Sequence, residues 1–141
     1  MAVNRRPVFS YKGDIQWSAA AILAANTAKD GTGTVTTVYT AGADGGFINK
    51  LVVKPIGTNV ATVVRVFINN GGANTTAANN TYLTDATIPA TTLTEVAAQT
   101  EVSIPINIPI PASYKINVTL GTAVAAGVQI TAVGGSYTDG A

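Results

Sequence analysis

Short runs of valine, isoleucine and threonine recur along the chain, and clusters of glycine and asparagine separate them about every ten residues. β-Branched side chains favour extended strands, whereas glycine and asparagine favour the turns that join strands. Helical periodicity is nearly absent. The pattern predicts an all-β chain, an antiparallel β-sandwich of jelly-roll type with about eight strands. Residues 18–141 would form this sandwich, and residues 1–17 an extended N-terminal arm or lead-in.

Six segments have the composition and alternation expected of strands. In one of them Phe47, Leu51 and Val53 are expected on one face, with Lys50 and Lys54 on the other. Another, which includes Val60, is apolar on both faces, and this places it in the middle of a sheet or under a subunit contact. The segments are residues 32–40, 47–56, 59–69, 101–111, 113–120 and 128–133.

The segment 101–111 permits a sharper inference about its place in the sheet. Its valine and isoleucines fall at even positions, 102 to 110, and therefore share one face. Its prolines stand at odd positions, 105, 109 and 111, so the missing N–H donors lie along one side of the strand. We expect an edge strand whose prolines prevent unwanted pairing. A polyproline ligand is the weaker alternative, because it would not require alternating isoleucines.

Two segments lack a strand pattern. Residues 18–28 are rich in alanine and are compatible with either a short helix or an extended buried strand. Residues 69–80 (NNGGANTTAANN) are polar and small, and an exposed loop is expected there. Because long loops often carry contacts, this loop is the first candidate for a partner-facing surface.

The N-terminal segment 1–17 has two interpretations. It is either a lead-in with one strand, whose Trp17 packs into the core, or an arm that reaches a neighbouring subunit. Arginine and aromatic residues are enriched at the energetic centres of interfaces. The predicted interface residues are Arg5, Arg6, Phe9, Tyr11 and Trp17.

This chain has few of the side chains that enzymes use for catalysis. Histidine and cysteine are absent, which removes the commonest general base, the thiol nucleophile and the usual transition-metal ligands. The carboxylates are scattered singly, and several precede a glycine as turn residues do. Glu95 and Glu101 flank one loop, but nothing in the sequence brings them together. We therefore expect no enzyme activity, no cofactor and no metal.

Charge and hydropathy restrict the partners. A net charge of +1 offers no basic field for nucleic acid, and no apolar run is long enough for a membrane helix or a secretory signal. Only 11% of the residues are charged, whereas 47% are hydrophobic. Soluble domains usually carry about 25% charged residues. The composition therefore indicates a surface that is covered by permanent contacts.

The phrases GTVTTVYTAGADGGFINKLVVKPIGTN, VATVVRVFINNGG and ASYKINVTLGTAVAAGVQITAVGG resemble small virion proteins of tailed bacteriophages, most closely the head decoration or cement proteins. The resemblance lies in the residue composition and pattern over most of the chain and includes no diagnostic motif. It implies a jelly-roll or sandwich subunit, often trimeric, that clamps the major capsid protein on the capsid exterior after assembly in the host cytoplasm. The alternatives are a fibre, spike or tail component, and a carbohydrate-binding module. A fibre should show a repeat, and a carbohydrate-binding module should show several exposed aromatic residues.

Overall fold

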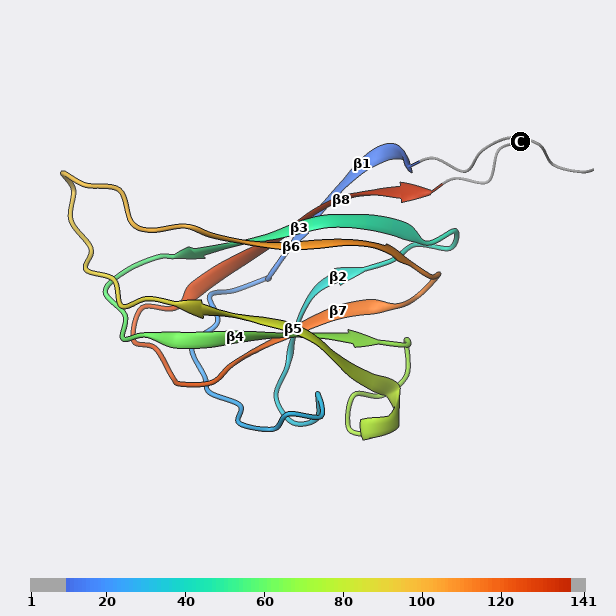
Figure 1. Cartoon of the computed structure of the whole chain (residues 1–141), viewed down its shortest axis with the longest axis horizontal. Helices are drawn as coiled ribbons and strands as arrows, with labels where there is room; N and C mark the ends of the chain where they lie inside the picture. The colour runs from blue at the N-terminus through green and yellow to red at the C-terminus, as the bar shows by residue number, and fades with distance from the viewer. Residues whose placement is uncertain (1–9, 138–141) are drawn as a thin grey trace, which may run out of the picture.

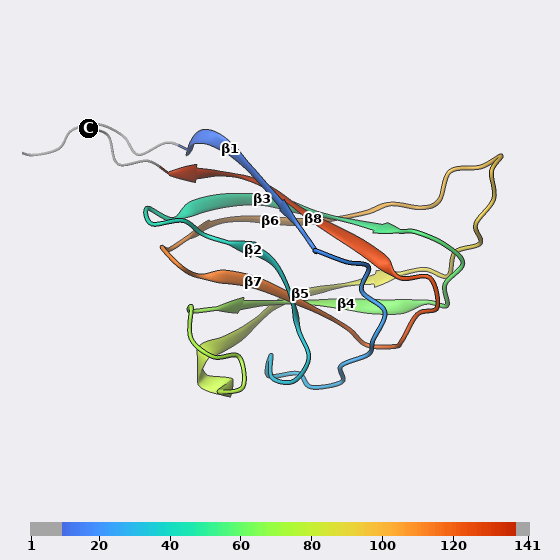
Figure 2. The ribbon, with the colours of Figure 1, turned by 180° about the vertical axis from the view of Figure 1, so that it is seen from behind.

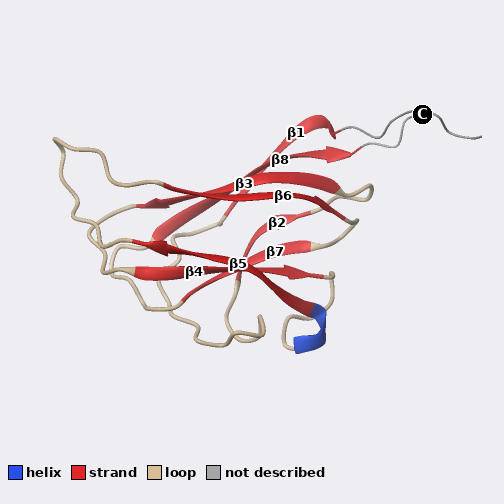
Figure 3. Cartoon of the chain, viewed as in Figure 1, coloured by secondary structure: helices blue, strands red, loops and turns tan. Residues whose placement is uncertain are grey.

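The computed structural model describes residues 10–137, with the backbone alone for Ser10 and Tyr11. These residues form eight strands and one turn of 3-10 helix (Figures 1 and 3). The elements are β1 (Ser10–Trp17), β2 (Thr36–Thr40), β3 (Gly46–Pro55), β4 (Thr62–Asn69), η1 (Ala77–Asn79), β5 (Asn80–Ile88), β6 (Val102–Ile110), β7 (Lys115–Leu120) and β8 (Val128–Tyr137).

Two four-stranded antiparallel sheets pack against each other, as both views show (Figures 1 and 2). The strand order is β1-β8-β3-β6 in the first sheet and β2-β7-β4-β5 in the second sheet. β1 pairs with β8, β2 with β7, β3 with β6 and β4 with β5, so the chain resembles a long hairpin rolled into two layers. This connectivity is that of a jelly roll. The predicted fold class is confirmed.

The core lies between the sheets and is built from alternate residues of the facing strands. Leu51 and Val53 of β3 face Val64 and Val66 of β4 across this layer, and all four side chains are fully buried. Because side chains alternate, every strand also has an outer face. What covers that outer face differs between the two sheets.

Residues 18–35, which join β1 to β2, cover the outer face of the second sheet. The N–H of Asn26 donates to the carbonyl of Leu120 (2.8 Å), and Arg65 Nη1 donates to the carbonyl of Asn26 (3.3 Å). Beneath this crossing segment Phe67 of β4 is fully buried. The two-sided apolar pattern of β4 is thereby explained, since β4 lies between β7 and β5 and its outer side is covered by the chain itself.

The N-terminal part of this crossing segment, residues 18–28, is neither of the two predicted structures. It is irregular and extended, and it contacts the sheets through two isolated bridges, Ile22 with Val128 and Ala25 with Leu120. Alanine favours a helix by only a few tenths of a kcal/mol per residue. Backbone hydrogen bonds to the ends of β7 and β8 outweigh that preference.

One predicted face is wrong. The register of β3 shifts between Ile48 and Lys50, where a bulge inserts an extra residue. The bulge reverses the alternation, so Phe47 points outward, opposite to Leu51, and Ile48 takes the core position. An alternation pattern cannot reveal such an inserted residue, because it assumes an unbroken period of two.

β6 lies at the edge of the first sheet, so the edge strand predicted from the prolines is confirmed. β5, at the edge of the second sheet, was not predicted, because apolar and polar residues share its exposed side. β4 begins at Thr62, which leaves Val60 in a loop and 57% exposed. β8 extends beyond its predicted end and includes Gly134. A Cβ atom at Gly134 would collide with the carbonyl oxygen of Phe47, which explains the glycine.

Tyr39 provides a test of the contact between the sheets at high pH. Its ring is fully buried, and its hydroxyl donates to Asp14 Oδ2 of β1 (3.1 Å). Burial, together with the hydrogen bond and charge of Asp14, raises the pKa of Tyr39 above the usual 10.0. The folded state thus retains the phenolic proton more tightly than the unfolded chain does. The free energy of unfolding should therefore fall as the pH rises above about 10.

Tyr39→Phe should reduce this alkaline loss of stability, as measured by urea unfolding between pH 7 and 11. Tyr114→Phe, which removes a half-buried phenol outside this contact, is the matched control and should retain the wild-type dependence. Equal slopes for the two variants would contradict the assignment.

Candidate functional site

Residues 10–137 leave the outer face of the first sheet uncovered. In Figures 1 and 2 no loop of the described chain crosses it in the way that residues 18–35 cross the second sheet. The strand register places outward side chains opposite one another in rows. One row contains Trp17, Thr131, Val52 and Ser103, the next contains Ile15, Val133, Lys50 and Pro105, and the third contains Gly13, Gly135, Phe47 and Pro109. We define the apolar face as Ile15, Trp17, Phe47, Val52, Pro105, Pro109 and Val133.

Between Asp14 and Trp17, β1 presents its apolar residues to solvent and its polar residues to the sandwich. Gln16 donates to the carbonyl of Thr40 (3.0 Å) and accepts from the N–H of the same residue (2.9 Å), and Asp14 accepts from Tyr39. The alternate residues Ile15 and Trp17 are 57% and 58% exposed. A strand that served only the fold would be expected to have the opposite arrangement, so this inverted strand indicates a contact outside the chain.

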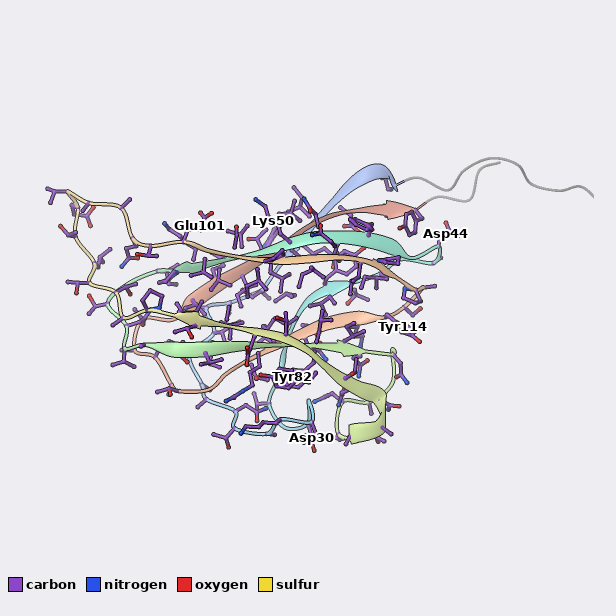
Figure 4. The ribbon with its side chains drawn as sticks, in the orientation of Figure 1. Asp30, Asp44, Lys50, Tyr82, Glu101 and Tyr114 are labelled. Atoms are coloured by element: carbon purple, nitrogen blue, oxygen red, sulfur yellow. The ribbon has the colours of Figure 1, made fainter. Side chains whose placement is uncertain are left out.

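Two lysines and one acid give this side of the sheet its charge. Glu101, which precedes β6, is exposed and projects to the same side as Lys50 (Figure 4). Lys50 stands between Val133 and Pro105 and projects from β3 away from the second sheet (Figure 4). Lys54, also on the outer side of β3, donates its amine to the carbonyl of Gln99 (2.8 Å) and so supports the loop between β5 and β6. The face is therefore apolar with a positive charge near its middle.

Of the predicted interface residues, the structure places Trp17 on the apolar face. Its exposure contradicts the alternative in which Trp17 packs into the core. Tyr11 belongs to β1, but only its backbone is described. Arg5, Arg6 and Phe9 lie outside the described residues.

The sequence did not identify the rest of the apolar face. A signal was present in residues 14–17, where apolar and polar residues alternate strictly. Alternation shows that a strand has two different faces, but it does not show which face turns inward.

The loop 69–80, which was predicted to be exposed and to face a partner, is held by hydrogen bonds among its own amides. Asn69 Nδ2 donates to Asn80 Oδ1 (2.8 Å), and Asn70 Nδ2 donates to Asn79 Oδ1 (3.3 Å). The depression between this loop and Tyr114 has a volume of about 170 Å³, smaller than the usual ligand pocket of roughly 300 Å³ or more. The amides beside the Tyr114 ring thus stabilise the loop itself.

Within residues 10–137 no three Asp or Glu side chains converge as a metal site would require. The same residues include no helix with the length and apolar character needed to cross a membrane. Comparisons with protein-family models, with curated proteins and with solved structures found no match to this chain.

Proposed function

We propose that this chain is a structural subunit of a virion, a decoration or cement protein that binds the major capsid protein on the exterior of a tailed-phage capsid. The inverted strand β1 carries this proposal, because it directs Ile15 and Trp17 to solvent while Asp14 and Gln16 serve the contact between the sheets. The subunit would act through contact alone, without a cofactor or nucleic acid.

The exposed apolar area and the low share of charged residues both suit a surface in lasting contact with a partner. Transferring apolar surface out of water contributes about 25 cal/mol per Å², and large exposed apolar patches usually mark interaction sites. A clamp also benefits from a contact area with few charges, since each charge removed from water must be compensated. Only 11% of this chain is charged, which suits a surface that remains covered.

The proposal includes self-association. Interfaces between identical subunits are more apolar than ordinary protein surface, and a trimer is the state typical of the decoration proteins that the sequence resembles. A fibre, spike or tail role would use the same apolar face, and capsid binding is the measurement that separates these virion roles.

Trp17→Ser tests the proposal. Burial of a tryptophan at an interface centre commonly contributes at least 2 kcal/mol, so capsid binding should weaken at least tenfold. The measurement is cosedimentation with capsids assembled from the proposed partner, the major capsid protein of the same phage, with the particle mass of the free protein followed by light scattering.

Leu23→Ser is the matched control, since Leu23 is 46% exposed but lies on the segment that covers the second sheet. It should bind as the wild type does. If the wild-type protein fails to bind capsids, or if Trp17→Ser binds as well as Leu23→Ser, the proposed function is wrong.

A further inference from the structure

The loop of residues 89–101, which joins β5 to β6, extends beyond the strand ends at one end of the sandwich (Figure 1). Loops of this length without secondary structure are uncommon in compact domains and are often functional. Val96 is 93% exposed and Leu93 is 52% exposed, and the exposed acid Glu95 lies between them. We call Leu93, Glu95 and Val96 the loop tip. The fold itself gains nothing from this apolar exposure.

Hydrogen bonds hold the base of this loop. Thr91 and Asn59 exchange two backbone hydrogen bonds (2.9 and 3.1 Å), and Thr91 Oγ1 donates to the carbonyl of Gly57 (2.7 Å). Near the start of β6, Gln99 Nε2 donates to the same carbonyl of Gly57 (2.9 Å). The carbonyl of Gln99 in turn accepts a hydrogen bond from the Lys54 amine. A loop anchored in this way loses less conformational entropy when its tip binds.

The apolar face and the loop tip complement each other. The face combines exposed apolar side chains with the positive charge of Lys50, and the tip combines exposed apolar side chains with the negative charge of Glu95. In a face-to-face pair Lys50 of each copy would lie among apolar side chains, since the row of Lys50 contains Ile15, Val133 and Pro105 and no carboxylate, and a charge buried without a partner opposes binding. The charge pattern therefore favours tip against face.

We propose that the loop tip of one copy binds the apolar face of a neighbouring copy, with Glu95 facing Lys50. The loop extends beyond the strand ends, so its tip lies clear of its own two sheets and is available to another copy (Figures 1 and 2). In a closed ring each copy gives one loop and receives one loop. This inference rests on the proposed function only for its expectation that the chain self-associates.

A charge exchange tests the contact directly. The full chain, K50E, E95K and the double variant K50E/E95K are compared by sedimentation equilibrium at low salt. Each single variant places like charges together and should weaken self-association about tenfold, whereas the double variant restores opposite charges and should recover most of that loss. High salt should reduce all these differences.

Lys29→Glu is the matched control, because Lys29 is exposed in the segment that covers the second sheet and lies on neither surface. Its association should equal that of the wild type, and thermal unfolding should confirm that every variant is folded. Val96→Ser adds a neutral test and should also weaken association.

A monomeric wild-type chain, unchanged association in the single variants, or a double variant as weak as the singles would overturn the inference. The capsid-binding part of the proposed function would survive those results if capsid binding still depended on Trp17, whereas a monomeric wild-type chain would remove its self-association. Conversely, recovery in the double variant without any capsid binding would support this contact and refute the capsid decoration role.

Discussion

Leu51→Ala is expected to lower the free energy of unfolding by about 3–5 kcal/mol, the largest effect of any single substitution proposed here. Leu51 is fully buried in the middle of β3, where Ile104 of β6 and Ala132 of β8 lie opposite its backbone. Its truncation removes favourable transfer of apolar atoms and leaves a cavity, because strands paired on both sides cannot close inward. Urea unfolding followed by tryptophan fluorescence or circular dichroism would measure the loss.

Val52→Ala is the matched control for this prediction. Val52 is the next residue of the same strand, but it points to the apolar face and is only half-buried. It should lose about 1 kcal/mol or less of folding stability. In the proposed function it should weaken capsid binding or self-association instead. Equal losses of stability at the two positions would contradict the assignment of inner and outer faces.

Asn59→Ala is expected to cost about 2–4 kcal/mol, since it leaves the N–H groups of Ala126 and Gly127 without partners and removes one of the two hydrogen bonds to the carbonyl of Gly127, which then keeps only the N–H of Ile56. Asn59 Nδ2 donates to the carbonyl of Gly127 (2.8 Å), and its Oδ1 accepts from the N–H groups of Ala126 (2.8 Å) and Gly127 (3.1 Å). The side chain is 6% exposed, so water reaches these groups poorly.

The same substitution should also loosen the projecting loop, because the backbone of Asn59 pairs with Thr91 at the base of that loop, and the lost side-chain bonds no longer hold this backbone against Ala126 and Gly127. Hydrogen exchange of residues 89–101 should accelerate along with the loss of global stability. Asn49→Ala, at an exposed position of β3, is the control and should change neither quantity appreciably. If Asn59→Ala unfolds at the same urea concentration as the control, the Asn59 side chain does not stabilise the contact between its own loop and residues 126–127.

Local pattern predicted much of the fold because a sandwich depends on strands whose period is two. The prolines of β6 were sufficient to place it at an edge, since a missing N–H prevents pairing wherever it occurs. The same reasoning failed at Phe47, where a bulge shifts the register, and at β5, whose exposed side mixes residue types. It also treated residues 69–80 as a plain loop, because a network of amides is a property of positions in space rather than of composition.

At the candidate site, too, the sequence predicted one part of the result and the structure decided the other, as Trp17 shows. Its residue type suggested an interface, but sequence left open whether it packs inside or faces a partner. The tertiary structure decided this through the partners of its neighbours, since Asp14 and Gln16 reach β2 and thereby turn Ile15 and Trp17 outward.

The sequence by itself determined the all-β class, the edge position of β6 and the shortage of charged and catalytic side chains. Only the tertiary structure decided that one sheet is covered by residues 18–35 and that the other presents an apolar face. Alternation specifies two faces for every strand, but which face turns inward, and whether a distant segment crosses the outer one, depends on contacts between residues far apart in the chain.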